Sequence, residues 1–456
     1  MESNNRTITR VATACITAAG LFSVFLLIYS IVRHKYAVNA MYSVLPAALT
    51  VLFFSSLRWK ESYRVNFALL VFVTGTVVYA GEIVVGYAEL YRHHHSFIRR
   101  KYEKLDLIER FRAQGKTVYP IFSSSELLSR RQTLDGCVPL GGIANATTIL
   151  GNESGTWILY ESDEHGFNNP PGIWDSDSVD VVSVGDSFVH GLAVEPGKDI
   201  SSHIRKRYPA TLNIGYAGNG PLRELAALGE YGTRVRPRFV LWFYYENDLI
   251  DLRNPENGSL FHRYLDPDFS QRLMEKQAFI DSALSHIVEQ SLRWELDARK
   301  CGGGVHTCAV HKVLKERSLF SIIALKALRR RIRFMFPESA DLTGELAQFG
   351  VVLAEARKRV EAWGGSLVFV YLPGKKRYSN PQQGDRIREG VLALVKDLNV
   401  PCIDIHGVFS AQPDPLSLFP DRPVVHYNAR GYELVADAVL AYIRAESQAV
   451  SPRRIE

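Results

Sequence analysis

An apolar run followed by a glycine turn with a serine stands at Val179-Asp-Val-Val-Ser-Val-Gly-Asp-Ser-Phe-Val-His-Gly191. The run Val179–Val184 has the composition of a buried β-strand. Gly185 permits a tight turn after it, and the turn presents the hydroxyl of Ser187 at the carboxyl end of the strand. Backbone amides at the start of a following helix could stabilise an oxyanion at the same place.

Similar apolar runs alternate with helical patterns along the rest of the chain. The expected strands are Val179–Val184, Leu212–Ile214, Phe239–Tyr245, Ser366–Leu372 and Cys402–Ile405. The expected helices are Arg223–Tyr231, Leu346–Trp363, Gln383–Leu398 and Ala429–Ile443. This alternation, with strands that are apolar almost throughout, predicts an α/β fold with a parallel sheet covered on both faces.

Groups suited to acyl transfer follow three of these strands besides the serine turn. Gly218 lies in a glycine turn after the second strand, and Asn247 follows the third. His426 stands just before the final helix. Ligands of open parallel sheets bind beyond the carboxyl ends of the strands, so we expect these groups to converge there. A serine, two donor groups and a histidine at one sheet edge indicate nucleophilic catalysis.

In these four blocks, matched in order between about 179 and 447, the chain resembles the SGNH (GDSL-type) hydrolase family. The resemblance implies a three-layer, flavodoxin-like parallel sheet, interrupted here by a helical insertion at 253–345. It implies that Ser187 is the nucleophile and His426 the general base. It also implies an oxyanion hole made of the Ser187 N–H, the Gly218 N–H and the side-chain amide of Asn247.

Two positions depart from the pattern of the family. Tyr245 stands where the third block has glycine, and Pro423 stands where an aspartate three residues before the histidine is usual. Asp421 is the nearest carboxylate and is expected to orient His426 in its place. A Ser-His dyad, or an acid from a distant part of the chain, is the alternative.

Other polar residues near these blocks have structural explanations beside functional ones. Asp163-Glu-His165 resembles the Asp-x-His pair of alginate-acetylation proteins in the superfamily, but a polar turn explains it as well. His190 could line the pocket. We expect the remaining four to support turns and strand ends: Asp186, Asp248, Asp404 and His406.

The N-terminal region is apolar enough for a membrane. Three runs are uncharged, at Val11–Val32, Tyr36–Leu57 and Val65–Gly81, and the last continues through Glu82 to Ala88. A helix needs about 20 such residues to cross the hydrocarbon layer, so we predict three transmembrane helices within 1–91. A juxtamembrane helix and connector follow at 92–134, then the hydrolase-like domain at 135–447 and a tail at 448–456. Basic residues flank the spans almost equally, so the orientation stays open.

The net charge and the cysteines say little about the function. The net charge is +6 over 456 residues, too weak to indicate nucleic-acid binding. Cys301 and Cys308 flank a short flexible loop and could form a disulfide, or be unrelated thiols. With His306 and His311 they match no strong zinc pattern, and His93–His95 suit a solvated helix edge better than a metal site. The basic amphipathic segment 312–333 could pack on the sheet, cover the site or lie on a membrane.

These observations predict a membrane-anchored serine esterase or O-acyltransferase that needs neither a metal nor an organic cofactor. By resemblance, its substrate is an acyl ester, expected to be acetyl, of a cell-envelope or exported polysaccharide. We expect the soluble domain outside the cytoplasmic membrane, where a membrane-bound acyltransferase could be a partner. The alternatives are a non-catalytic carbohydrate-binding or assembly subunit that keeps the fold, and a lipid-directed esterase.

Overall fold

The computed structural model describes residues 2–33, 40–129, 133–254, 258–300, 342–379, 385–421 and 424–450. The described residues fall into two compact units. The N-terminal unit extends to Arg99, and the α/β unit begins at Arg100. Each unit is described by itself.

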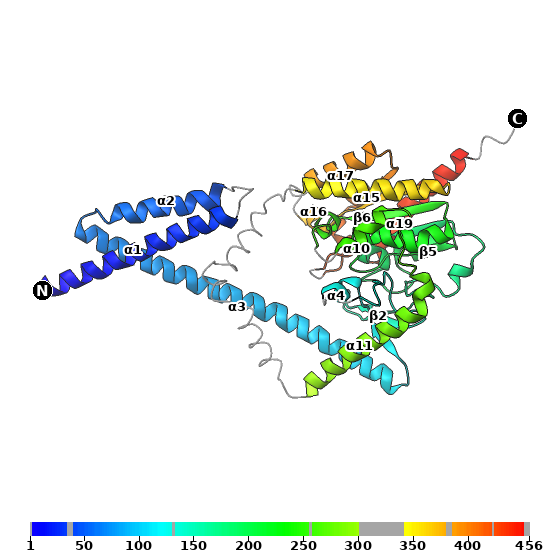
Figure 1. The fold of residues 1–456 in the computed structure, drawn as a ribbon, viewed down its shortest axis with the longest axis horizontal. Helices are drawn as coiled ribbons and strands as arrows, with labels where there is room; N and C mark the ends of the chain where they lie inside the picture. The colour runs from blue at the N-terminus through cyan, green and yellow to red at the C-terminus, as the bar shows by residue number, and fades with distance from the viewer. Residues whose placement is uncertain are drawn as a thin grey trace. The chain divides into compact units, whose positions relative to one another are not determined.

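The α/β unit is built on a five-stranded sheet in which every neighbouring pair is parallel (Figure 1). The first strand in the sequence lies second from one edge, and the later strands follow it outward, which is the flavodoxin-like order. All five strands coincide with the predicted apolar runs to within two residues. In sheet order they are β5 (Thr211–Asn213), β4 (Val181–Val184), β6 (Phe239–Tyr245), β7 (Ser366–Leu372) and β8 (Cys402–Asp404).

Helices cover both faces of this sheet, so the predicted three-layer α/β arrangement is confirmed. Alternate residues of β6 belong to two different cores, since Trp242 packs in one and Phe243 in the other. All seven residues of β6 are buried, which explains its unbroken apolar sequence. One face carries α7 (Pro221–Ala227), α15 (Thr343–Ala362) and α17 (Asp385–Asp397), and the other carries α6 (Ile200–Arg205), α18 (Ile405–Ser410) and α19 (Ala429–Val450).

A second, three-stranded sheet precedes the large one and was not predicted. Its strands are β1 (Val118–Pro120), β2 (Thr147–Gly151) and β3 (Ile158–Glu161). β2 pairs parallel with β1 and antiparallel with β3, so that Thr147 lies opposite Glu161 and Gly151 opposite Ile158. Strands this short, in a segment rich in Gly, Asn and Asp, have no clear apolar alternation. The loop that joins β2 to β3 is important for the site described below.

The insertion predicted at 253–345 is helical where the structure describes it. The longest helix among its described residues, α11 (Gln277–Lys300), lies along the C-terminal part of α3 (Glu61–Ala113). Lys101 bonds Glu295 at 2.9 Å, and Arg299 bonds Asp106 at 2.7 Å.

The shorter helical elements of the α/β unit are α4 (Ser124–Ser129), η1 (Ile173–Asp175), α5 (Ser187–His190), η2 (Leu228–Gly232), α8 (Thr233–Val235), α9 (Asp248–Asp251), α10 (Gly258–His262), η4 (Arg263–Leu265), η5 (Met274–Lys276), α16 (Lys375–Ser379) and η6 (Pro415–Leu418).

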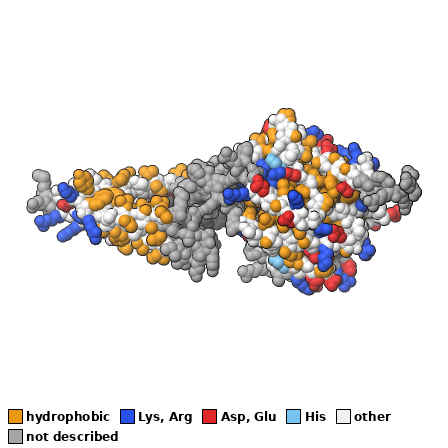
Figure 2. All heavy atoms as spheres, turned by 90° about the horizontal axis from the view of Figure 1, so that it is seen from above, with side chains coloured by type: hydrophobic (Ala, Val, Ile, Leu, Met, Phe, Trp, Pro, Cys, Tyr) orange, Lys and Arg blue, Asp and Glu red, His pale blue; other side chains and the backbone are white. Residues whose placement is uncertain are grey.

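Among the residues that the structure describes, the N-terminal unit contains two helical stretches long and apolar enough to cross a membrane, not the predicted three. They are Asn5–Tyr29 in α1 (Glu2–Arg33) and Glu61–Ala88 in α3 (Glu61–Ala113). The helix between them, α2 (Ala40–Ser56), has 17 residues. At about 1.5 Å per residue it is about 26 Å long, shorter than the roughly 30 Å hydrocarbon layer. Hydrophobic side chains gather on the surface of this unit (Figure 2).

The third helix is also longer than expected. α3 continues without a break from the apolar stretch to Ala113, so the predicted juxtamembrane helix begins as its direct extension and includes His93–His95. The segment 312–333, with its three alternative roles, and the cluster of Cys301, His306, Cys308 and His311 lie outside the described residues.

Candidate active site

Ser187 is the first residue of α5, one turn beyond the end of β4, as the sequence predicted. The turn needs glycine at 185, because a Cβ there would lie 2.5 Å from Cγ2 of Val189 and 3.1 Å from the carbonyl oxygen of Phe243. Asp186 caps the helix by accepting a hydrogen bond from the Phe188 amide at 2.9 Å. Burial raises the pKa of this carboxyl. The expected structural role of Asp186 agrees with these contacts.

Ser187, His426 and Glu153 form a continuous hydrogen-bonded chain. Oγ of Ser187 lies 2.7 Å from Nε2 of His426, and Nδ1 of the same ring lies 2.6 Å from Oε2 of Glu153. A carboxylate at Nδ1 accepts a hydrogen bond from the N–H at that position, so Nε2 is the basic nitrogen that can accept the serine proton. His426 is only 5% exposed, whereas the Glu153 side chain is 25% exposed. This is the arrangement of a serine, a general base and an orienting acid.

The orienting carboxylate is not the one that the sequence indicated. Asp421 was expected to replace the missing aspartate, but its side chain is exposed, and Glu153 occupies Nδ1 of His426. Glu153 comes from the β2–β3 loop, which the small sheet carries to the histidine. The structure thus favours the alternative of a distant acid over both Asp421 and an unsupported dyad. Pro423 lies outside the described residues.

The two predicted oxyanion donors follow the strands on either side of β4. Gly218 comes after β5 and Asn247 after β6, and both strands pair directly with β4. Gly218 has a φ of 87°, a left-handed conformation that favours glycine, and its carbonyl accepts from Arg223 at 2.8 Å. The Asn247 amide donates to Oδ2 of Asp251 at 2.6 Å. An amide has two N–H groups, and the second N–H of Asn247 has no acceptor among the described residues.

Buried carboxylates lie close to these donors. Asp248 accepts a hydrogen bond from the Tyr245 amide at 2.9 Å and so braces the end of β6, in agreement with its expected role. Burial, followed by the charge of Asp186, raises the pKa of Asp251 to about 6. Glu224 is fully buried, and neither of its carboxylate oxygens accepts a hydrogen bond from the described residues. Burial, with the charges of Asp186 and Asp251 second, raises its pKa well above the ordinary value.

His190 supports the site without lining it. Its ring is completely buried, Nδ1 accepts from the Ala217 amide at 3.1 Å, and Nε2 lies 2.9 Å from the Tyr160 hydroxyl. Nδ1 must therefore be unprotonated, and burial lowers the pKa of His190 to about 3. Because Ala217 precedes Gly218, this neutral histidine holds the turn that carries one predicted oxyanion donor.

The other polar candidates have structural partners. The buried carboxylate of Asp163 accepts bonds from the amides of His165 and Phe167 and from the side chains of Asn169 and Trp174, as a polar turn requires. Asp404 caps α18 and pairs with Arg388. Nδ1 of His406 lies 3.1 Å from the Tyr378 hydroxyl. Across the described ranges, no group of three or more His, Cys, Asp and Glu residues is arranged to hold a metal ion.

No family model and no curated protein matches the chain significantly. Among solved structures, the chain is similar to a lipase/acylhydrolase from Enterococcus faecalis, with 12% identity, a TM-score of 0.32, and coverage of 59% of this chain and 96% of that one. It is also similar to an acetyl xylan esterase, with 12% identity, a TM-score of 0.30, and coverage of 58% and 100%. A third similar structure is an acetyl-xylooligosaccharide esterase from Geobacillus Stearmophilus, with 14% identity, a TM-score of 0.30, and coverage of 58% of this chain and 94% of that one. At identities and scores this low, only the geometry of the site carries the functional argument.

Proposed function

We propose that this chain is a membrane-anchored serine esterase or O-acyltransferase. The single observation that carries the proposal is the hydrogen-bonded chain from Oγ of Ser187 through His426 to Glu153, with distances of 2.7 and 2.6 Å. It lies at the carboxyl end of β4, where a parallel sheet binds its ligands. The resemblance of the four sequence blocks to SGNH hydrolases supports the same reaction class.

In the proposed mechanism, Nε2 of His426 takes the proton of Ser187 as its oxygen attacks the carbonyl carbon of the ester. Glu153 stabilises the resulting imidazolium and holds the ring in its orientation. The Ser187 and Gly218 amides and the second N–H of Asn247 would donate to the oxyanion. His426 then protonates the leaving alcohol, and the acyl group remains on Ser187. Transfer to water is hydrolysis, and transfer to a sugar hydroxyl is acylation.

We propose an O-acyl, and specifically O-acetyl, ester of a cell-envelope or exported polysaccharide as the substrate. Two helical stretches of 25 and 28 residues support an anchor in the cytoplasmic membrane. The proposed location of the α/β unit is outside that membrane, where such a polysaccharide and a membrane-bound acyltransferase partner would be accessible. The non-catalytic alternative rested on the missing aspartate before His426, and Glu153 removes that reason.

The test uses the full chain, purified in detergent, with 4-nitrophenyl acetate and a serine-directed phosphonate. We expect acetate release and labelling of Ser187, and loss of both in Ser187→Ala. His426→Ala should abolish turnover. Acetyl transfer to oligosaccharides is then measured with the same protein, by comparing free acetate with acetylated sugar.

Two outcomes would contradict the proposal. A folded wild-type chain that neither releases acetate nor reacts with the phosphonate has no activated serine, and the carbohydrate-binding subunit becomes the better interpretation. Strong preference for long-chain over acetyl esters would instead favour the lipid-directed esterase.

A further inference from the structure

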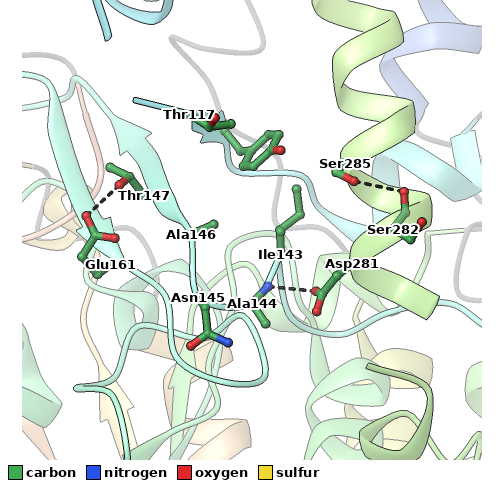
Figure 3. A pocket seen from close by; sticks show the side chains of 11 residues that line it. Thr117, Ile143, Ala144, Asn145, Ala146, Thr147, Glu161, Asp281, Ser282 and Ser285 are labelled. Atoms are coloured by element: carbon green, nitrogen blue, oxygen red, sulfur yellow. Dashed lines mark hydrogen bonds between the residues drawn. The ribbon is translucent and has the colours of Figure 1, made fainter. Parts of the chain in front are cut away.

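A polar hollow of about 440 Å³ lies away from Ser187, between the small sheet and α11 (Figure 3). Thr117 and Tyr119, from β1 and its approach, line it together with Thr147 at the start of β2. Asp281 and Ser282 line it from α11. Its volume falls within the range of roughly 300 to 1,000 Å³ that is typical of small-molecule sites.

The lining has the chemistry of a site for neutral hydroxyl groups. It combines two carboxylates, Glu161 and Asp281, with the amide of Asn145, several hydroxyls and the ring of Tyr119, and it includes no Lys, Arg or His. Two carboxylates without a cation repel phosphates and other anions. A predominantly polar wall does not suit an acyl chain. Sugar hydroxyls donate well to carboxylates, and an aromatic ring accepts the apolar face of a sugar.

Both carboxylates are held in position by the protein through one oxygen. Oε1 of Glu161 accepts from the Thr147 hydroxyl at 2.8 Å. Oδ1 of Asp281 accepts from the Ala144 amide and from Gln277 Nε2, both at 2.9 Å. Among the described residues, no hydrogen bond reaches the second oxygen of either carboxylate. Two oriented acceptors therefore remain available to a ligand, as Figure 3 shows for the bonds from Thr147 and Ala144.

The hollow and the candidate active site share one β-hairpin. Thr147 and Glu161 are paired at one end of the hairpin, and the loop after Gly151 carries Glu153 to His426 at the other end. Glu153 lies six positions after Thr147. At about 3.3 Å per residue, their Cα atoms lie at most about 20 Å apart. This upper limit places the hollow and the loop that carries Glu153 within the reach of a single oligomeric or polymeric ligand.

We propose that this hollow is a saccharide-binding subsite that holds a part of the glycan remote from the reacting ester. This role in substrate binding rests on the proposed function. Contacts at the hollow are the same before and during the reaction, so they lower KM for long substrates and leave kcat unchanged. Small esters such as 4-nitrophenyl acetate do not reach the hollow and gain nothing from it.

The test measures binding to the full-length Ser187→Ala chain by titration calorimetry, in a detergent without a sugar headgroup. The probes are xylohexaose, mannohexaose and cellohexaose, with oligolysine as a cationic probe. We expect at least one hexasaccharide to bind. Glu161→Gln, which keeps the bond from Thr147 but loses the charge, should weaken that binding about tenfold. Ser282→Arg, an exposed change that fills the hollow, should abolish it. Glu361→Gln on α15 is the matched control and should bind like the parent.

Binding of no hexasaccharide, or equal binding to all variants, would overturn the proposal. Preferential binding of oligolysine, lost in Glu161→Gln, would assign the hollow to cationic peptides instead. The same substitutions with Ser187 intact separate the two proposals. Turnover of 4-nitrophenyl acetate without saccharide binding rejects the subsite alone. Saccharide binding at the hollow without turnover or phosphonate labelling rejects the esterase and leaves a carbohydrate-binding protein.

Discussion

Nδ1 of His426 lies 2.6 Å from Oε2 of Glu153, a residue 273 positions earlier in the chain. The two come from different parts of the α/β unit, since Glu153 follows β2 of the small sheet and His426 precedes α19, a helix on one face of the large sheet. The small sheet therefore contributes directly to the candidate active site. It supplies the acid of the candidate triad, and the opposite end of the same hairpin forms the proposed saccharide subsite.

Replacing Glu153 by glutamine should reduce kcat for 4-nitrophenyl acetate by about 10²- to 10⁴-fold with little change in KM. The amide can no longer stabilise the imidazolium and allows the wrong tautomer of His426. Steady-state kinetics on the full chain measure this effect. Asp421→Asn is the matched control, and a loss of similar size in that variant would restore Asp421 as the orienting acid.

Ser187→Ala and His426→Ala should not be additive. The two side chains act as one unit through their 2.7 Å bond, so the double variant should be about as inactive as either single variant. The measurement is residual turnover of the three proteins at equal concentrations of folded protein. A double variant slower than the singles by the product of their effects would mean that the two residues act independently.

Glu224→Leu should stabilise the chain, and more so at higher pH. The carboxyl of Glu224 is fully buried and its pKa is raised, so the folded chain holds this proton more tightly than the unfolded chain does. The free energy of unfolding therefore falls as the pH rises from the ordinary pKa of glutamate to the pKa in the folded chain. Removing it should add about 1–3 kcal/mol at pH 8, where its ionisation is most costly, and less at pH 5. Thermal unfolding at both pH values provides the comparison. A lower midpoint at pH 8 would show that Glu224 makes a favourable interaction.

His190→Phe should lower stability and weaken its dependence on acid. The pKa of His190 is lowered from 6.5 to about 3, so between these values the unfolded chain binds a proton that the folded chain does not. The contribution of neutral His190 to the free energy of unfolding is fully present above pH 6.5, and it falls by about 1 kcal/mol per pH unit below that value. The substitution removes this slope and leaves the Ala217 amide unpaired, at a cost of about 1–3 kcal/mol. Unfolding midpoints from pH 4 to pH 8 test both effects, and an unchanged acid slope would rule out His190 as its cause.

The large sheet could be predicted because its pattern is local. β6 and β7 were predicted to the residue, since a strand covered on both faces must be apolar throughout. Ser187 and His426 could be located for a related reason, because the carboxyl ends of parallel strands meet at one edge. The transmembrane prediction was less accurate. An uncharged stretch sets the greatest length that a transmembrane helix can have there, but it does not show how much of the stretch is helical. The helix in the second stretch, α2, has 17 residues.

The sequence by itself determined the positions of the five strands along the chain, the serine turn and the histidine before the last helix, because each depends on short-range patterns of apolar, glycine and polar residues. Only the tertiary structure decided which carboxylate meets His426. A single glutamate in a polar turn, at Asn152-Glu-Ser-Gly155, has no periodicity or spacing that separates it from any other exposed acid. Its position depends on the pairing of three short strands and on the packing of that sheet beside the large one. Long-range contacts of this kind produce no recognisable pattern in the neighbouring residues of the sequence.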